Sequence, residues 1–574
     1  MEEKHLRTLE FPQVLQRLAQ HTTFSAGRVL ALALRPSPIY VEVEQSQRET
    51  AEARFLLDTA GGLPLGGAHD VRSLASNARR GAVLQPTDLL DIRGTLRAGG
   101  RVQRALERPR EQVPLLADIA GRIEPCTRLA AEIDSSISDQ GEVVDDASPA
   151  LARIRREMRT AHDRLLDRLN NIVASSRYGT FLQEALVTQR SGRYVIPIKA
   201  EFKGRIPGIV HDTSASGATI FIEPLSVVDL GNRWRELQIE EQKEVERILA
   251  DLSAQVADNA DELIWTVEAL AELDMIVARG RYANELDAAA PIMVPYKSRY
   301  DTATLDLRQA RHPLLDPDLV VPIDVYLREG VRALVITGPN TGGKTVSLKT
   351  VGLMAAMAQA GMHLPVSDGS ELSVFEGLYA DIGDEQSIEQ SLSTFSSHLT
   401  NIITILQDVN ERSLVLLDEL GAGTDPVEGS ALARAILTHL LGRQVTTLVA
   451  THYSELKMYA QTTPGVENAS VEFDVQTLSP TYRMQIGLPG RSNAFAIAER
   501  LGLPTVIGHA ARALVSPEEL EAETLLGEIQ EAHRDTVAAR DEAVLARLEL
   551  AEQDRRLTIR LAAIDAERAS IMGE

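Results

Sequence analysis

The sequence predicts a multidomain protein that combines helical domains with an α/β domain. Three observations lead to this fold class. The 574 residues are too many for one hydrophobic core and correspond to roughly two to four domains. Aromatic residues make up only 4% of the chain, whereas Ala, Leu, Glu and Arg are abundant, which favours helices. Beyond about residue 297, short apolar β-branched runs alternate with helical segments, as in a parallel sheet with crossover helices.

Residues 1–135 are predicted to form a core of short helices. Leu6, Leu9 and Val14 are among the apolar residues that recur at helical spacing in this region. Prolines near residue 36 and the glycine-rich run 61–67 interrupt the pattern and should separate the helices.

Residues 136–225 are predicted to form a basic helical arm that carries a β-hairpin or meander. The stretch 151–173 is strongly helical and rich in arginine. After Gln189, β-branched runs punctuated by Gly, Pro and Ser occur at 193–198, 208–210 and 218–222. Residues 226–296 then read as one or two long helices, a length that suits a lever or a bundle better than a compact globule.

The α/β domain is predicted over residues 297–516. Its expected strands are the runs 332–337, 413–417 and 446–450. Residues 517–574 carry 15 acidic and 7 basic residues, with no proline or aromatic residue after Pro517, so we expect a charged helix that begins a coiled coil. We also expect the gene product to continue beyond Glu574, because no cap ends this helix.

Composition limits the function classes. The net charge of −23 argues against a non-specific nucleic-acid binder when it is taken over the whole chain. The single cysteine, Cys126, excludes an intrachain disulfide and a zinc site built on cysteines. The N-terminus has no signal-peptide pattern, and the apolar runs are much shorter than the roughly 20 residues that a membrane helix needs. We therefore expect a cytoplasmic protein without a membrane partner.

A phosphate-binding loop lies between the first α/β strand and the helix expected at 346–360. The pattern is Gly-x-x-x-x-Gly-Lys-Thr, and its context of strand, loop and helix is the one that the motif requires. Backbone N–H groups would cradle phosphates, Lys344 would contact the β- and γ-oxygens, and Thr345 would bind Mg²⁺. The alternative is a chance glycine-rich turn. The expected ATP-binding residues are Gly338, Pro339, Asn340, Thr341, Gly342, Gly343, Lys344, Thr345 and Val346.

Two further strand ends carry candidate catalytic residues. The apolar run 414–417 is followed by Asp418, expected to hold Mg²⁺, and Glu419, expected to polarise the attacking water as a general base. Alone, such a pair is more often a helix N-cap, but its separation from the loop allows an adjacent strand. His452 ends a third strand and could sense the γ-phosphate, although a lone His is more often structural.

These segments together resemble the MutS ATPases, a branch of the ABC-type P-loop fold. The resemblance covers roughly residues 226–516. It is carried by the segments 311–314, 337–345, 417–424, 450–456 and 487–504, and by 271–282 at the end of the family's lever helices. It implies that the region 487–504 forms a helical dimerisation element. It also implies that Ser393 reaches the γ-phosphate bound by the opposite subunit, so that a homodimer completes each site. The alternative role for Ser393 is a helix N-cap.

Two features indicate the branch of the family. The Gly-x-Phe-Tyr-Glu wedge that inserts into mismatches is not found near the N-terminus, where the segment 9–12 is no match. The segments 6–11 and 212–224 resemble the second bacterial MutS type. That resemblance implies suppression of homologous recombination through branched DNA, or splitting of collided ribosomes through rRNA. Members usually continue into a C-terminal Smr nuclease domain, which nothing in residues 1–574 resembles, so nuclease activity is not expected in this chain.

Local charge indicates a polyanion surface. Residues 151–207 contain 12 Lys/Arg and 5 Asp/Glu, and residues 61–110 contain 9 and 4. Such clusters neutralise phosphates without sequence preference. The alternative is a solvated helix with internal ion pairs, such as Arg153 with Glu157. We therefore expect an ATP-driven clamp on nucleic acid or the ribosome, in which long helices transmit closure of the ATPase dimer. The alternative is a recognition module for branched or mismatched DNA, with ATP as a conformational switch.

Overall fold

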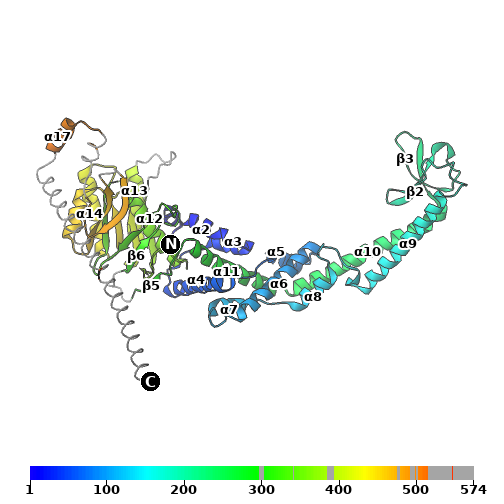
Figure 1. Cartoon of the computed structure of the whole chain (residues 1–574), viewed down its shortest axis with the longest axis horizontal. Coiled ribbons are helices and arrows are strands. Elements are labelled where there is room, and N and C mark those ends of the chain that lie inside the picture. Colours follow the sequence, from blue (N-terminus) through cyan, green and yellow to red (C-terminus); the bar gives the residue numbers. More distant parts are fainter. Residues whose placement is uncertain are drawn as a thin grey trace, which may run out of the picture. The chain divides into compact units, whose positions relative to one another are not determined.

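The computed structural model describes residues 1–296, 303–339, 342–383, 394–474, 479–490 and 502–514, with the single residues Ala498 and Ala546. The chain forms two compact units (Figure 1). Unit 1 contains Met1–Arg17, Leu34–Ala51 and Arg279–Glu574, and unit 2 contains Leu18–Ala33 and Glu52–Ala278.

The compact units join segments that the sequence-based division keeps apart. Residues 1–17 and 34–51 belong to the unit that holds the α/β domain, although they lie in the predicted N-terminal segment. Residues 52–135, 136–225 and most of 226–296 fall together in unit 2. The five-segment division therefore stays a prediction, and the charged tail at 517–574 lies almost wholly outside the described residues.

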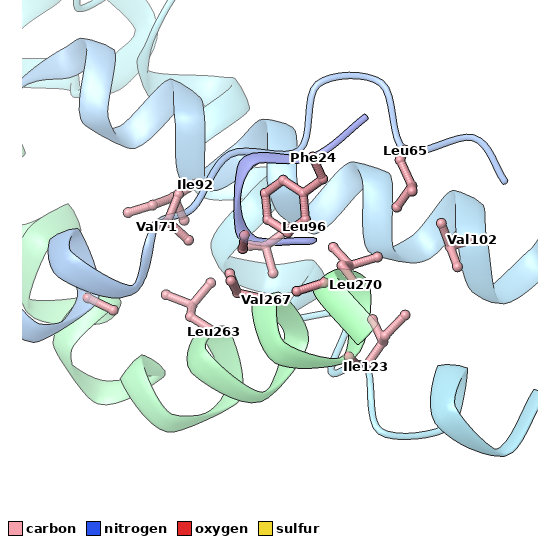
Figure 2. Close-up of a cluster of buried hydrophobic side chains, with 14 of the residues drawn as sticks. Phe24, Leu65, Val71, Ile92, Leu96, Val102, Ile123, Leu263, Val267 and Leu270 are labelled. Carbon is pink, nitrogen blue, oxygen red and sulfur yellow. The ribbon is translucent and has the colours of Figure 1, made fainter. Parts of the chain in front are cut away.

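Unit 2 is built around a helical core. Its shorter helices are α3 (Ser25–Ala33), α5 (Arg72–Arg79), α6 (Pro86–Glu107), α7 (Pro114–Ala120) and α8 (Thr127–Ser136), while α4 (Tyr40–Ala60) and α11 (Ala260–Glu285) contain residues of both units. Figure 2 shows Val267 and Leu270 of α11 gathered with Leu96 of α6 and with Phe24. The apolar faces expected from the helical spacing are thus buried against one another.

Two long helices of unit 2 carry a small sheet. After a 3₁₀ turn (η1, Asp145–Ala147), α9 (Pro149–Val173) packs along α10 (Leu225–Asp258), and Figure 1 shows the sheet beyond their far ends. The strands are β1 (Thr188–Arg190), β2 (Arg193–Lys199), β3 (Gly208–Thr213) and β4 (Thr219–Pro224), with the 3₁₀ turn η2 (Ala200–Phe202) between β2 and β3. All pairs are antiparallel in the order β1-β2-β4-β3, so β3 and β4 form a hairpin but the sheet is not a simple meander.

The start of α3 is fixed by a carboxylate from α11. Asp274 is fully buried, and its oxygens accept hydrogen bonds from the Thr23 N–H and hydroxyl and from the Phe24 N–H, at 2.9–3.1 Å. These backbone donors precede the first turn of α3, where no intrahelical acceptor exists for them. A Cβ at Gly27 would lie 2.4 Å from Asp274 Oδ2, so only glycine permits this approach.

The centre of unit 1 is a six-stranded sheet in the order β10-β11-β12-β8-β13-β14, and Figure 1 shows helices flanking it. Pairing is parallel from β10 to β13, and only β14 is antiparallel. The bounds are β8 (Ala333–Thr337), β10 (Gly377–Asp381), β11 (Ser413–Leu417), β12 (Thr446–Ala450), β13 (Val466–Asp474) and β14 (Ser479–Ile486). The three predicted strands are therefore present. The expected adjacency of β8 and β11 is wrong, because β12 lies between them.

Unit 1 also contains a second, smaller sheet and further helices. A second sheet has the order β5-β9-β6-β7, with β5 (Ile292–Val294), β6 (Leu305–Ala310), β7 (Ile323–Tyr326) and β9 (Glu371–Ser373). The helices are α1 (Glu3–Thr8), α2 (Phe11–Gln20, whose last residues belong to unit 2), α12 (Lys344–Gln359), α13 (Thr394–Asp408), α14 (Pro426–Gly442), α15 (Ser454–Thr462) and α17 (Thr505–Ala513). No helix of the described residues is long and apolar enough to cross a membrane.

The N-terminal residues of unit 1 pack directly on the α/β sheet and its first helix. A Cβ at Gly352 of α12 would lie 2.5 Å from side-chain atoms of both Leu9 and Leu416, so Leu9 rests on that glycine. His5 is buried and its Nδ1 lies 3.1 Å from the Ala380 carbonyl oxygen of β10. These contacts join residues more than 300 positions apart in the sequence, and helical periodicity gives no indication of them.

We predict that Asp274→Ala destabilises unit 2 by about 2–4 kcal/mol, because it leaves the buried Phe24 N–H and the partly buried Thr23 N–H and hydroxyl without their acceptor. Both tryptophans of the chain, Trp234 and Trp265, lie in unit 2, so their fluorescence during urea unfolding reports on this unit. Asp251→Ala removes an exposed carboxylate that pairs with Arg247 and serves as the control. Equal unfolding midpoints for the two variants would contradict the role of Asp274.

Candidate nucleotide site

The predicted phosphate loop lies between the carboxyl end of β8 and the start of α12. Gly338 has φ +139° and Gly343 has φ +94°, values that side-chain-bearing residues rarely adopt. A Cβ at Gly338 would also lie 3.1 Å from the Val471 carbonyl oxygen of β13. The N–H of Gly342 donates to the carbonyl of Pro339 at 2.9 Å. Asn340 and Thr341 lie outside the described residues, and Val346 is exposed at the start of α12.

Lys344 is the first residue of α12 and is buried. Its Nζ donates to the Gly338 carbonyl at 2.7 Å, so the ammonium group lies inside the turn of the loop. Burial lowers the pKa of Lys344, and the carboxylates of Glu419 and Asp418 act against this decrease. The helix N-terminus and this cation together favour an anion at the loop.

Thr345 and Asp418 meet across the sheet. The Thr345 hydroxyl donates to Asp418 Oδ2 at 2.6 Å, and the Asp418 N–H donates to the Asp381 carbonyl at 2.8 Å. Burial raises the pKa of Asp418, and the bond from Thr345 partly offsets this effect. Asp418 Oδ1 is also buried, and no described group donates to it. A carboxylate oxygen with an open position beside a hydroxyl suits Mg²⁺, which prefers hard oxygen ligands.

Glu419 follows Asp418 in a strained turn. Its φ is +47°, a left-handed conformation that costs a non-glycine residue on the order of 1 kcal/mol. The turn is closed by the Ala422 N–H, which donates to the Glu419 carbonyl at 2.9 Å. The Glu419 side chain is exposed and lines a cleft of about 360 Å³. The other lining residues are Thr345, Gly383, His398, Asp418, Ala422 and Gly423.

Of the two other predicted site residues, only His452 falls within the described residues. His452 follows β12 at the same edge of the sheet, but its exposed ring packs against Tyr453, with centroids 4.6 Å apart, and does not line the cleft. Ser393 precedes the first residue of α13 in sequence and lies outside the described residues, as do residues 491–497 of the expected dimerisation element.

The structure adds residues that the sequence patterns did not single out. Lys457 of α15 is buried and donates from Nζ to the Gly490 carbonyl at 2.8 Å, and the Gly490 N–H donates to the Thr337 hydroxyl at 2.7 Å. Residue 490 thereby rests on the strand that leads into the phosphate loop. His398 of α13 lines the cleft itself. In the sequence, His398 is marked only by its position a few residues after Ser393, and the family resemblance in that segment points to the serine alone.

Comparison with known proteins is consistent with this geometry. Residues 334–518 match MutS domain V. The chain is 50% identical to "Endonuclease MutS2" of Symbiobacterium thermophilum over 92% of its own length and 65% of the relative. It is 47% identical to the protein of the same name from Pelotomaculum thermopropionicum over 99% of its length and 71% of the relative. A Geobacillus relative of that name is also 47% identical, over 93% and 68%.

The chain thus spans about two thirds of the length of these relatives. The match to MutS domain V contains β8, the phosphate loop and Asp418, so the cleft lies in an ATPase domain. With 47% identity maintained over 71% of a named relative, the chain belongs to the MutS2 family of MutS-domain ATPases.

Proposed function

We propose that the chain is one subunit of a homodimeric, Mg²⁺-dependent ATPase that acts as a clamp on nucleic acid or on ribosomal RNA. One observation carries the enzymatic part. Asp418 is buried with one oxygen bonded to Thr345 and the other without a described partner, beside the strained Glu419. A buried carboxylate in that state is costly unless a cation joins it.

The residues have separate proposed roles in hydrolysis. Thr345 and Asp418 would hold Mg²⁺, which neutralises charge on the β- and γ-phosphates when it is bound. Lys344 would turn from the Gly338 carbonyl to a phosphate oxygen. Glu419 would accept the proton of the attacking water, since its carboxylate faces the cleft rather than the core. His452 remains our candidate for sensing the γ-phosphate from the same sheet edge.

A second chain is part of the proposal. The resemblance assigns Ser393 to the γ-phosphate bound by the partner, which would make each site composite. Two clefts would then close together when both hold ATP. The stability of the dimer should depend on bound nucleotide, because ATP would form part of the interface.

A stripe of arginines on α9 supports the polyanion-binding part. At about 100° per residue, Arg153, Arg156, Arg164 and Arg168 fall within one 120° arc of the helix. All four are exposed, whereas the buried Leu151, Ile154, Leu165 and Leu169 occupy the opposite face.

Two other charged residues near the arginine stripe, Arg155 and Glu157, form ion pairs. Arg155 is bonded to Asp145 and Glu241 and belongs to the packing of α9 on α10. Glu157, which shares the exposed face, pairs with Arg233 of α10 rather than with Arg153. Asp167 is the other carboxylate within the arc. The arginines therefore outnumber the carboxylates on a surface suited to phosphates.

The endonuclease activity in the relatives' printed name is not part of this proposal. The chain spans 65–71% of those relatives, and we assign no nuclease step to its residues. The partner is proposed as branched DNA or as collided ribosomes, both of which present closely spaced phosphates in an unusual geometry.

We predict opposite nucleotide phenotypes for two variants. Lys344→Ala should lose ATP binding, whereas Glu419→Gln should bind ATP, lose at least about 100-fold in turnover and accumulate as an ATP-bound dimer. Steady-state hydrolysis, fluorescent-nucleotide titration and light scattering with and without ATP measure these effects. Glu428→Gln, an exposed carboxylate in the first turn of α14, is the matched control. Normal hydrolysis by Glu419→Gln would refute the catalytic assignment.

We predict that replacing Arg153, Arg156, Arg164 and Arg168 with Gln weakens DNA binding without changing basal ATP turnover. If all four contact phosphates, the slope of log K against log salt should fall in magnitude by about 3 to 4, at roughly 0.9 per phosphate. The control changes charge equally at exposed, carboxylate-paired arginines of unit 2, namely Arg79, Arg97, Arg122 and Arg128. Equal slopes for the two quadruple variants would remove α9 from the proposed surface.

The physiological partner is tested by capture. Tagged Glu419→Gln protein with ATP, recovered from lysate, should retain its partner because the closed state cannot reset. Parallel ATPase assays with collided ribosomes, four-way junctions and linear duplex rank the candidates. Stimulation by either of the first two over linear duplex supports the clamp. Stimulation by a single mismatch alone would instead favour mismatch recognition and contradict the proposal.

A further inference from the structure

A buried carboxylate next to the cleft has no role in the mechanism described so far. Asp381 is the last residue of β10 and is almost fully buried. Its two oxygens accept from different side chains of α13: Oδ2 lies 2.9 Å from His398 Nδ1, and Oδ1 accepts from Asn401 Nδ2 at 2.8 Å. Its backbone carbonyl accepts from Asp418 N–H at 2.8 Å. Asp381 therefore attaches α13 to the end of β10 and, through Asp418, to the end of β11, where Asp418 and Glu419 follow the strand.

The two partners of Asp381 differ in their surroundings. Asn401 is buried, and its amide also lies 3.4 Å from the Ala380 carbonyl of β10, while its Oδ1 accepts a hydrogen bond from Lys4 Nζ of α1 at 2.9 Å. His398 is partly exposed, and its ring lines the same cleft as Thr345, Asp418 and Glu419. Asn401 thus joins α13 to β10 and to α1, whereas His398 presents an imidazole to the cleft.

The bond to Asp381 determines the chemistry of that imidazole. An ionised carboxylate only accepts hydrogen bonds, so Nδ1 of His398 carries the proton. In the neutral ring Nε2 is then an acceptor. A carboxylate that holds the Nδ1–H also fixes the orientation of the ring, as in hydrolases that use an Asp–His pair. His398 is thereby an oriented acceptor that lines the same cleft as Glu419.

We propose that His398 is a further catalytic residue that positions the attacking water. This inference rests on the proposed ATPase function, with Glu419 as the base. One O–H of the water donates to Glu419 and the other to Nε2 of His398, so a lone pair of the oxygen is directed at the γ-phosphorus. As the O–P bond forms, the bond from phosphorus to the β,γ-bridging oxygen breaks and ADP leaves. The proton passes to Glu419, and His398 keeps a neutral ring. Asp381 acts through His398 as a positioning residue.

Three variants separate this role from simple attachment of α13. His398→Asn keeps an amide near the position of Nδ1 and removes the acceptor at Nε2, whereas His398→Gln places an amide oxygen within reach of the Nε2 position. Asn401→Ala removes the other bond to Asp381, together with the bond from Lys4, and alters no residue that lines the cleft. Each is compared with the unaltered chain and with Glu419→Gln. The measurements are kcat and KM for ATP, single-turnover hydrolysis, affinity for a fluorescent ATP analogue, and calorimetric unfolding.

We expect His398→Asn to lower kcat and the single-turnover rate at least about tenfold, with KM and nucleotide affinity changed less than about twofold. His398→Gln should recover part of the rate. Asn401→Ala should lower the unfolding temperature while kcat stays near that of the unaltered chain. An unchanged kcat in His398→Asn overturns the inference, and so does an equal loss of kcat in Asn401→Ala, which would indicate attachment alone. Normal hydrolysis by Glu419→Gln refutes the proposed function instead, so the two failures are distinguishable.

Discussion

The hydrogen bond from Thr345 to Asp418 joins the phosphate loop to a strand two places away in the sheet. It forms only if β8 and β11 end at the same edge and level, with β12 between them. Parallel pairing ensures this, because Ile336 is in register with Ala450 and Leu417 with Val449. The positions of Lys344 and Glu419 follow from this constraint, since each is adjacent in sequence to one end of the bond.

Burial gives that edge its chemical character. Lys344 and Asp418 are both buried. Burial lowers the pKa of Lys344 and raises the pKa of Asp418, so it favours the neutral form of each group. Asp418 Oδ1 has no donor among the described residues, so the described fold leaves this carboxylate incompletely satisfied. Burial of such a carboxylate lowers the stability of the fold, and binding of a charged ligand restores that stability. The left-handed backbone at Glu419 adds to the same local cost.

The sequence was informative wherever the deciding interactions are local. The runs that predicted β8, β11 and β12 match the observed strands to within a residue, and α12 starts at the lysine of the loop. Spatial order was not predictable in this way, because nothing in the chain order places β12 between β8 and β11. The contact of Leu9 with Gly352 depends on complementary shapes far apart in sequence. Asp381 and His398 are 17 residues apart and are unremarkable singly, and their meaning arises only from the 2.9 Å contact.

Charge counts were similarly coarse. The excess of seven positive charges over residues 151–207 overstates the surface, since Arg155 and Arg159 are neutralised by Asp145 and Glu241. The net charge of −23 understates the basic surface, because screening at physiological salt limits the influence of an exposed charge to about 8 Å. A polyanion would meet the local surface of α9, where helical geometry places Arg153 and Arg164 on the same exposed face, about three turns apart, with the buried apolar residues on the opposite face. A chain with a negative net charge can therefore present a basic surface, provided that the carboxylates near that surface form ion pairs and the others lie on different parts of the chain.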